Sequence, residues 1–356
     1  MSAIFLNIFY IIIALLVFAL LIFIHELGHY VFGKIFKFKI NEFSIGFGKA
    51  IWKKTRKNGE VFAIRIIPLG GYCAFEGEEE TTDNPDSFNK KVWWQRLIIF
   101  FGGAFFNFLA AIVAAVALLM VMGDGLTAAY SFDEDYQTHI STLSETEYFK
   151  EADIFLEIDN VKPSYLNGGA FSLMSKQEVG KPYTVKVRRD KQVIVLTITN
   201  YKTVERNNSD YASAGLYQEA YVRYNFGTSL LKSVPFCADI SWECLKIIGN
   251  LLIGKQSIQN LGGPITAVSA VAQAAGISFR YLLLFFTILS LNLAVFNLLP
   301  IPALDGARMV FVIIEGVRGR PINEKIEQSI HTIGLIILFS FILLVDFLQI
   351  FVFRLL

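Results

Sequence analysis

Charged residues are scarce in this sequence: Asp, Glu, Lys and Arg make up 18% of its 356 residues, against about 25% in soluble globular proteins. Cysteine is scarcer still, and three cysteines do not make a disulfide framework. No cluster of lysine and arginine carries interleaved aromatic residues, so nothing indicates nucleic-acid binding. The amino terminus lacks the basic region and the small-residue cleavage site of a secretory signal peptide. These features favour a membrane protein that retains its first apolar segment.

Apolar residues are abundant instead, at 54% of the chain, and phenylalanine alone occurs 33 times. The hydrocarbon core of a bilayer requires about 20 apolar residues of helix. Four stretches meet this requirement, at residues 4–30, 97–122, 281–299 and 333–353. One such stretch could be a buried helix of a large soluble protein, but four favour membrane spans. We therefore expect an α-helical polytopic membrane protein with four transmembrane helices.

The distribution of lysine and arginine predicts the orientation of these spans, because cytoplasmic loops are enriched in both residues. The segment between the first two spans and the short loop between the last two are rich in them. Residues 123–143, which follow the second span, carry four acidic residues and neither lysine nor arginine. We therefore expect both termini outside the cell and both basic loops in the cytoplasm. The first and third spans then run in the same direction.

The long segment between the second and third spans is expected to be soluble and outward-facing. Residues 128–201 alternate apolar and polar side chains in short runs separated by turns, which predicts one small, mainly β domain. Residues 227–263 are apolar with scattered charges and a proline. We interpret them as amphipathic helices on the outer interface and not as a fifth span.

The sequence HELGH at residues 25–29 lies inside the first span. On a helix, two histidines four residues apart share one face and can bind one Zn²⁺, while the glutamate between them acts as a general base. The pattern also arises by chance, and the histidines could simply cap a helix end near the cytoplasmic surface. Ionisable residues inside a span are costly, however, which favours a functional site. We predict His25 and His29 as zinc ligands and Glu26 as the catalytic base.

A catalytic zinc site needs a third protein ligand. His139 lies in the outward domain, on the wrong side of the membrane, and His331 begins the fourth span. Asp305 is the stronger candidate, because it follows the third span at its cytoplasmic end, at the depth expected for the two histidines. A lone Leu-Asp-Gly would ordinarily be a turn after a proline-broken helix. Beside an HExxH motif in a parallel span, it predicts the third ligand.

HELGH in the first span, NLLPIPALDG at residues 297–306 and a β-rich insert together resemble the site-2 protease family, and most closely its bacterial RseP/RasP branch. The resemblance covers essentially the whole chain. It implies that Asp305 is a zinc ligand, that the insert is a PDZ domain, and that residues 43–72 form a membrane-associated β-hairpin whose edge adds substrate as a strand. A plain cytoplasmic β-turn is the alternative for this hairpin. The residues implied to bind substrate are Asn107, Asn292, Asn297, Pro300 and Pro302.

The chain departs from the family pattern at three places. Ala104 stands where the family often has proline, and Ala307 replaces the second glycine of the usual pair after Asp305. Residues 151–154 read Glu-Ala-Asp-Ile where the PDZ-like insert usually has a glycine-aspartate turn.

The expected organisation has seven parts. They are 1–33, the first span with HExxH; 34–94, the cytoplasmic or re-entrant β segment; 95–123, the second span; 124–205, the extracytoplasmic PDZ-like domain; 206–280, an amphipathic interfacial segment; 281–328, the third span with Leu-Asp-Gly and a cytoplasmic loop; and 329–356, the fourth span.

The predicted function is zinc-dependent endoproteolysis in or near the lipid bilayer of the plasma or inner membrane. The expected substrates are single-span membrane proteins such as anti-sigma factors or remnant signal peptides, as in regulated intramembrane proteolysis. A metal transporter could use the same ligands, but the middles of the second and fourth spans carry almost no ionisable residues. A catalytically silent scaffold built on the PDZ-like domain is also conceivable, but the intact motifs argue against it.

Overall fold

A computed structural model describes residues 3–78, 82, 84–206, 209–255, 262–320 and 322–352. The chain forms two compact units. The helical unit comprises Met1–Ala115 and Val234–Leu356, and the β unit comprises Val116–Ser233.

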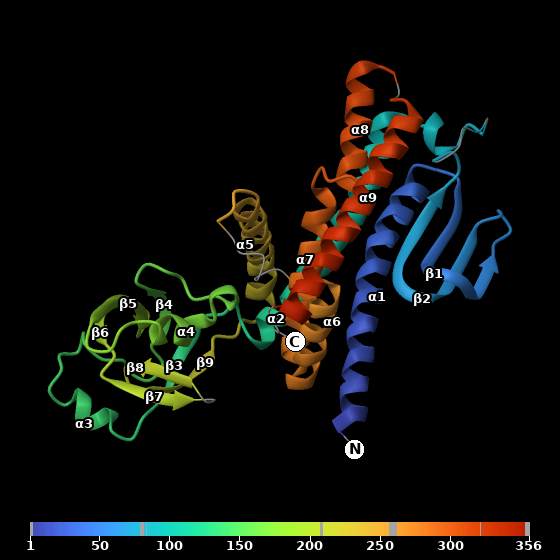
Figure 1. Ribbon diagram of the computed structural model, residues 1–356. Helices are drawn as coiled ribbons and strands as arrows, with labels where there is room; N and C mark the ends of the chain where they lie inside the picture. The colour runs from blue at the N-terminus through green and yellow to red at the C-terminus, as the bar shows by residue number, and fades with distance from the viewer. Residues whose placement is uncertain are drawn as a thin grey trace. The chain divides into compact units, whose positions relative to one another are not determined.

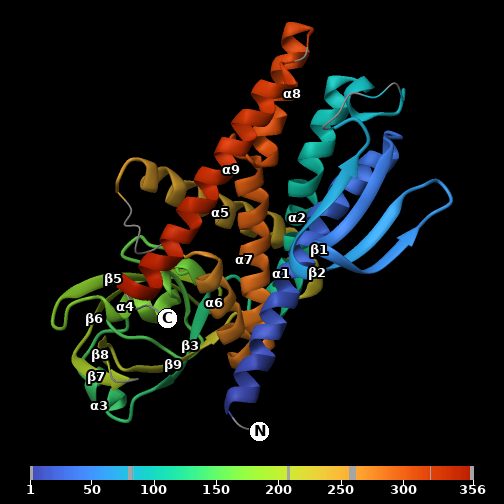
Figure 2. The same cartoon turned by 45° about the vertical axis from the view of Figure 1, so that its right-hand side comes forward.

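In the described part of the chain, four helices are long and apolar enough to cross a membrane. They are α1 (Ala3–Ile35), α2 (Trp93–Val121), α7 (Phe279–Leu298) and α9 (Glu324–Phe347), the last continued by a π-helical segment, Leu348–Val352. They coincide with the four stretches expected from hydropathy, so that prediction is confirmed. Within the helical unit, α1 and α7 run in one direction and α9 runs in the other (Figure 1, Figure 2).

Local sequence accounts for where two of these helices begin and for the apolar surface that the helices expose. The Ser278 hydroxyl accepts a hydrogen bond from the Tyr281 amide at the start of α7, and Asn323 does the same for Lys325 at the start of α9. Such caps satisfy amides that have no partner inside the helix. Apolar side chains stay exposed along the helices, with Leu16 and Val113 each more than 60% exposed. Exposed apolar helices of this length suit a lipid environment.

Further helices are α5 (Phe226–Leu252), α6 (Pro264–Ile277) and α8 (Asp305–Arg318). The first two fall in the segment expected at the interface, part of which lies outside the described residues. α6 packs inside the helical unit, where Val271 and Ala272 share a buried cluster with Ala14 of α1. The expected interfacial position of this segment stays a prediction. α8 occupies most of the basic loop expected between the last two spans.

β1 (Ile40–Thr55) and β2 (Val61–Phe75) form an antiparallel hairpin that folds back on itself. Phe43 lies opposite both Cys73 and Phe62, so the first half of β1 is paired with two segments of β2. Gly46 and Gly48 have φ of 85° and 82° where β1 bends, a conformation that glycine adopts without strain. The predicted hairpin is therefore present, as a doubled-over ribbon.

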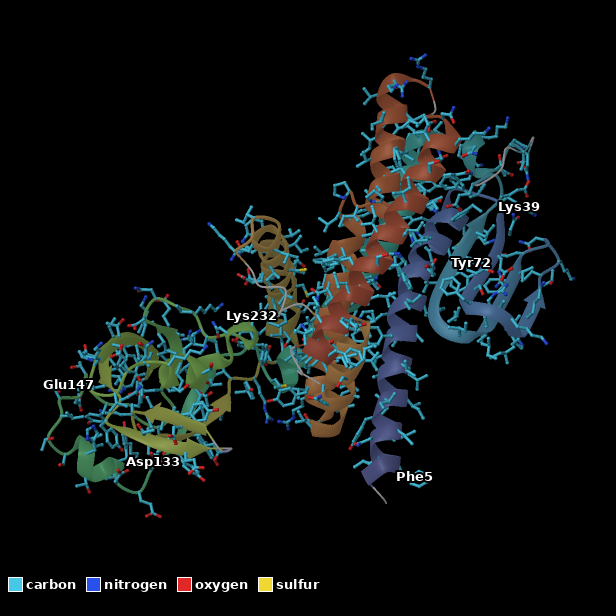
Figure 3. All side chains as sticks on the ribbon, in the orientation of Figure 1. Phe5, Lys39, Tyr72, Asp133, Glu147 and Lys232 are labelled. Atoms are coloured by element: carbon cyan, nitrogen blue, oxygen red, sulfur yellow. The ribbon has the colours of Figure 1, made fainter. Side chains whose placement is uncertain are left out.

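One polar cluster ties the layers of this ribbon together. Glu42 Oε1 accepts hydrogen bonds from Arg65 Nη2 at 2.5 Å and from the Tyr72 hydroxyl at 2.8 Å. Burial alone would raise the pKa of Glu42, but the hydrogen bonds from Arg65 and Tyr72 outweigh it and lower the pKa. Tyr72 is marked on the hairpin in Figure 3. A phenylalanine-rich core that includes Phe43, Phe75 and Phe100 packs beneath the hairpin.

The β unit is built on one five-stranded sheet in the order β6-β5-β4-β3-β9, with antiparallel neighbours throughout. The strands are β3 (Thr127–Phe132), β4 (Ile154–Ile158), β5 (Pro182–Arg189), β6 (Gln192–Thr199) and β9 (Leu216–Tyr221). β7 (Lys202–Arg206) pairs with β8 (Ser209–Ser213), and the short helices are α3 (Tyr136–Ile140) and α4 (Gly169–Ser175). The core is apolar and includes Phe149, Phe155, Val185 and Leu196.

The sheet continues past the boundary expected at residue 205. β9 pairs with β3, where Thr127 lies opposite Tyr221, so the β domain closes on a strand from the segment assigned to the interface. The hydropathy of the sequence does not predict β9, because this strand has one buried residue, Leu216, followed by half-buried and exposed ones.

Candidate metal centre

The two motif histidines project from α1 on one face. They are four residues apart on a continuous helix, and both are buried, at 9% and 7% exposure. Their Nε2 atoms lie 3.2 Å apart. Residues four apart on an α-helix are neighbours along one side, so the helix itself brings the two nitrogens together.

Asp305 meets these histidines from a distant part of the chain. It is the first residue of α8, which begins after the short loop that follows α7. Its Oδ2 lies 3.0 Å from His25 Nε2 and 3.4 Å from His29 Nε2. Within the described residues, these three form the one group of His, Cys, Asp or Glu side chains close enough to share a metal ion.

The spacing of the three donor atoms fits zinc. Tetrahedral Zn²⁺ has bonds of about 2.0–2.2 Å to nitrogen and oxygen, which separates neighbouring ligand atoms by about 3.3–3.5 Å. The observed separations of 3.2, 3.0 and 3.4 Å are close to that triangle. Two neutral imidazole nitrogens and a carboxylate are also a donor set typical of catalytic zinc, with one position left for water.

The second nitrogen of each ring is held by α2. His29 Nδ1 lies 2.8 Å from the Ile99 carbonyl oxygen, and His25 Nδ1 lies 3.2 Å from Asn107 Nδ2. If both Nε2 atoms bind metal, both Nδ1 atoms carry protons and need acceptors. Rotating the Asn107 amide by 180° would supply one, since Asn107 Oδ1 is buried without a hydrogen-bond partner in the described chain. Asn107 thus contacts a predicted zinc ligand, and its expected part in substrate binding stays a prediction.

Glycines allow α1 and α2 to cross almost backbone to backbone at this level. A Cβ on Gly28 would lie 2.1 Å from the Gly102 carbonyl oxygen. A Cβ on Gly103 would lie 2.5 Å from both the His25 Cε1 and His29 Nε2 atoms. The missing side chain of Gly103 therefore leaves the volume that the two imidazoles fill. Sequence reasoning did not assign these glycines a role, although Gly102 and Gly103 stand five and four residues before Asn107.

The Glu26 side chain projects from α1 toward the second half of β2. A Cβ on Gly71 would be 3.1 Å from Glu26 Cγ and 3.0 Å from the Ser44 carbonyl oxygen. The backbone at Gly71 therefore passes directly beside the predicted base. Residues 71–75 pair with residues 40–45 on one side.

The other predicted residues surround the loop between α7 and α8. Asn297 is buried and donates from Nδ2 to the Leu293 carbonyl of its own helix at 3.0 Å. Asn292 and Pro302 are half-buried, and Pro300 is exposed. None of them is a member of the three-residue group. Their expected part in substrate binding stays a prediction.

Gly306 fits the start of α8 against the end of α7. A Cβ there would lie 2.2 Å from the Leu299 carbonyl oxygen. The glycine of Leu-Asp-Gly is thus required by a close backbone approach next to Asp305. The histidine alternatives lie elsewhere: His139 stacks on Tyr201 in the β unit, and His331 Nδ1 accepts a hydrogen bond from the Ala303 amide at 3.1 Å.

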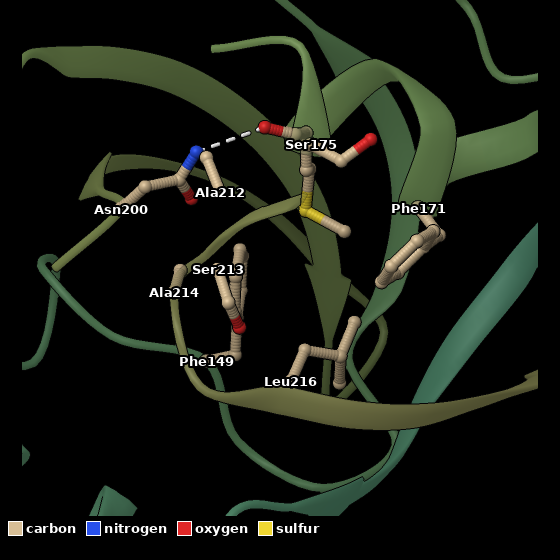
Figure 4. A pocket seen from close by; sticks show the side chains of 9 residues that line it. Phe149, Phe171, Ser175, Asn200, Ala212, Ser213, Ala214 and Leu216 are labelled. Atoms are coloured by element: carbon tan, nitrogen blue, oxygen red, sulfur yellow. Dashed lines mark hydrogen bonds between the residues drawn. The ribbon is translucent and has the colours of Figure 1, made fainter. Parts of the chain in front are cut away.

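The β unit contains a small cavity of about 10 Å³ between α4 and the strands β8 and β9. Phe171 and Met174 line it from the helix, and Ala212 and Leu216 line it from the strands (Figure 4). Asn200 Nδ2 donates to the Met174 carbonyl at 2.9 Å and fixes the helix beside the sheet. The lining carries no acid, base or metal-ligand group, so this cavity has no catalytic chemistry of its own.

Comparisons with known proteins find relatives that are described as zinc metalloproteases. A model of the family described as "Peptidase family M50" matches residues 13–341. A Fusobacterium nucleatum protein named "Putative zinc metalloprotease" is 31% identical over 347 residues, covering 94% of this chain and 96% of that protein. A Clostridium perfringens protein with the same descriptive name is 31% identical over 344 residues, covering 94% and 97%. The "Regulator of sigma E protease" of Haemophilus influenzae is 24% identical over 429 aligned positions, covering 93% and 97%.

Proposed function

The chain belongs to peptidase family M50 and is a zinc metalloprotease, and from this premise we propose that it cleaves single-span membrane proteins inside or near the bilayer. The observation that carries the proposal is where the donor atoms stand in the chain. His25 and His29 lie within α1, an apolar helix long enough to cross a membrane, and Asp305, at the start of α8, reaches them shortly after another such helix. A site built on such helices suits a substrate that is itself in the membrane.

In this proposal His25, His29 and Asp305 are the zinc ligands, and Glu26 is the general base. Zinc held by these three residues would supply Lewis acidity, to polarise the scissile carbonyl and to lower the pKa of a water molecule. Glu26 accepts the proton from that water and delivers it to the leaving amine. The Ile99 carbonyl and Asn107 keep the imidazoles oriented, and the crossing of α1 and α2 at Gly28 and Gly102 keeps the rings from shifting.

A helical substrate hides its amides in internal hydrogen bonds, so it must unwind before cleavage. We assign the unwound segment to the space beside residues 71–75, where strand addition would align a peptide next to Glu26. Asn292, Asn297, Pro300 and Pro302 lie on α7 and in the loop that leads to Asp305, and we propose that they help to hold the unwound chain. Substrates with helix-breaking residues such as glycine, serine or asparagine should therefore be favoured.

We further propose that substrates are first shortened on the outer side, as expected for anti-sigma factors or remnant signal peptides. The name of the Haemophilus influenzae relative supports the first class. In the orientation given by the basic loops, both termini and the β unit lie outside, and the metal centre lies near the cytoplasmic surface. We interpret the β unit as a PDZ-like domain. It could act as a size filter or as a surface that positions substrate, and deleting it distinguishes the two roles.

The decisive test separates metal binding from hydrolysis. Glu26→Gln should keep zinc and lose cleavage of a single-span substrate, because the base is not a ligand. Asp305→Ala should lose both. Zinc content of the purified variants and cleavage in reconstituted membranes provide the two readouts. Full zinc content and normal cleavage in Asp305→Ala would remove Asp305 from the ligand set and make His331 the next candidate.

A further inference from the structure

The loop that delivers Asp305 contains a strained residue. Ala303, two positions before Asp305, has φ of +81°. This left-handed region is unfavourable for residues with a Cβ, and non-glycine residues remain there only where their surroundings hold them. The Ile301 amide donates to the Leu299 carbonyl at 2.7 Å, and the Leu304 amide donates to the Ile301 carbonyl at 3.1 Å. The second bond closes a β-turn with Pro302 and Ala303 at its centre, and it leaves the Ala303 amide to make a contact outside the loop.

α9 supplies that contact through His331. The Ala303 amide donates to His331 Nδ1 at 3.1 Å. Since Nδ1 accepts, the neutral ring carries its proton on Nε2. The ring also packs against Phe311 of α8, with the centroids 5.5 Å apart. His331 therefore bridges α9, the strained residue and the helix that begins at Asp305.

Gly334 brings α9 close enough for this bond. A Cβ at Gly334 would lie 2.2 Å from Pro302 Cβ and 3.0 Å from the Pro302 carbonyl carbon. Residues three apart on a helix lie on the same face, so His331 and Gly334 meet the loop side by side, at Ala303 and Pro302. The other side of the loop is fixed by Gly306, which packs against the Leu298 and Leu299 carbonyls.

We propose that His331, together with the close approach at Gly334, holds the loop at residues 299–304 in the conformation that presents Asp305 to the metal. His331 is thus a positioning residue of the metal centre and not a ligand. The inference rests on the proposed ligand set, because it gives the loop a purpose only if Asp305 binds zinc. Groups that orient ligands without touching the metal typically change metal affinity 10- to 100-fold when removed.

Zinc affinity of the purified full-length protein, measured by competition with a chromogenic chelator, tests the proposal. His331→Leu removes the acceptor and should weaken zinc binding about 10-fold or more. His331→Asn places a side-chain oxygen close to the position of Nδ1 and should stay within about 3-fold of the unmodified protein, by the same scale. His139→Leu, which removes a histidine of the β unit, is the matched control and should change nothing.

Ala303→Gly distinguishes positioning of the loop by His331 from a general role of His331 in helix packing. Glycine adopts positive φ without strain, so the substitution should relieve the loop of its need for His331. Alone it should leave zinc affinity equal or tighter. Combined with His331→Leu it should restore most of the lost affinity. If His331→Leu does not yield folded protein, His331→Gln replaces it, because the longer side chain cannot place its oxygen at the Nδ1 position.

The outcomes separate this inference from the proposed function. Unmodified affinity in His331→Leu, with weak binding in Asp305→Ala, overturns the positioning role alone. Equal losses in His331→Leu, His331→Asn and the double variant with Ala303→Gly also overturn it, since they would assign the effect to helix packing. Unmodified affinity in Asp305→Ala rejects the ligand set itself.

Discussion

Gly103 has no side chain, and that is its contribution to the metal centre. A methyl group there would occupy the volume of the His25 and His29 rings, at 2.5 Å from atoms of each. We therefore predict that Gly103→Ala rotates the imidazoles and weakens zinc binding about 10- to 100-fold, the range seen when the orientation of ligands is disturbed. Chelator competition on the purified variant provides the measurement.

Ala104→Gly is the control for this prediction, because it changes the neighbouring, equally buried position without adding volume. Helix propensity costs it about 1 kcal/mol, yet zinc affinity should persist. Unchanged affinity in Gly103→Ala would show that the rings have room to move.

At the scale of residues, sequence reasoning reached the groups with chemistry and missed those with shape. His25, Glu26 and His29 follow from helical periodicity, and Asp305 followed from its place after a parallel span. The roles of Gly28, Gly103 and Gly334 depend on which helices cross at those positions, and one sequence does not contain that information. The family resemblance implied that Asn107 binds substrate, and the structure adds that its neighbour in space is His25.

Among the elements, the doubled-over hairpin depends on Glu42, which receives hydrogen bonds from Arg65 and Tyr72. We predict that Arg65→Met loosens the ribbon and raises KM for a membrane substrate several-fold, while zinc affinity stays constant. The reason is that residues 71–75 lie beside Glu26 but supply no metal-binding atom. Cleavage kinetics and the rate of limited proteolysis in the hairpin give the two measurements.

Acidification offers an independent check on the same cluster. The pKa of Glu42 is lower in the folded hairpin than in the unfolded chain. Its stabilising contribution is therefore complete above the ordinary glutamate pKa and is lost as the pH falls through the lowered value. The rate of limited proteolysis in the hairpin should therefore rise as the pH falls. Glu42→Gln should make that rate less dependent on pH. An unchanged profile would mean that another group controls the opening of the hairpin.

Elements with strong local signals could be predicted, and elements defined by pairing could not. Four spans followed from length and hydropathy alone. The folding of the hairpin onto itself depends on Phe43 pairing with both Cys73 and Phe62, and a register with two partners leaves no pattern along the chain. The charges of α8 concealed it in the sequence, since Arg308 and Glu315 resemble residues of a solvated loop until their ion pairs with Glu78 and Arg96 are known.

For the whole molecule, the basic loops predict orientation. In a background without the native cysteines, Lys53→Cys on the hairpin and Lys176→Cys on the β unit place matched exposed residues in the two units. A membrane-impermeant thiol reagent added to intact cells should label position 176 and leave position 53 unlabelled until the cells are broken. The reverse pattern would overturn both the orientation and the depth assigned to the metal centre.

The β unit can be removed at a natural seam. The Val222 amide donates to the Leu126 carbonyl at 3.0 Å, and Thr127 lies opposite Tyr221. Residues 127–221 can therefore be replaced by a short flexible linker without separating ends that already meet. A domain of this size has a radius of gyration of about 12 Å, and as the proposed size filter it would exclude a substrate with an external domain of similar size.

We predict that the deletion keeps zinc, cleaves a shortened substrate at the unmodified rate and gains cleavage of the full-length one. Parallel assays with the two substrates measure this. Loss of cleavage for both, with zinc retained, would instead identify the β unit as a surface that recruits or positions substrate.

The donors of the proposed metal set come from opposite ends of the chain: two from α1 and one from the start of α8. During biosynthesis, the ribosome releases α1 and α2 into the membrane long before it reaches Asp305. Until then the nascent protein carries the base and both imidazoles but lacks the carboxylate, and two ligands hold zinc poorly. The enzyme is consequently latent while it is being made. A prematurely terminated chain that lacks α8 would sit in the membrane without the power to damage its neighbours.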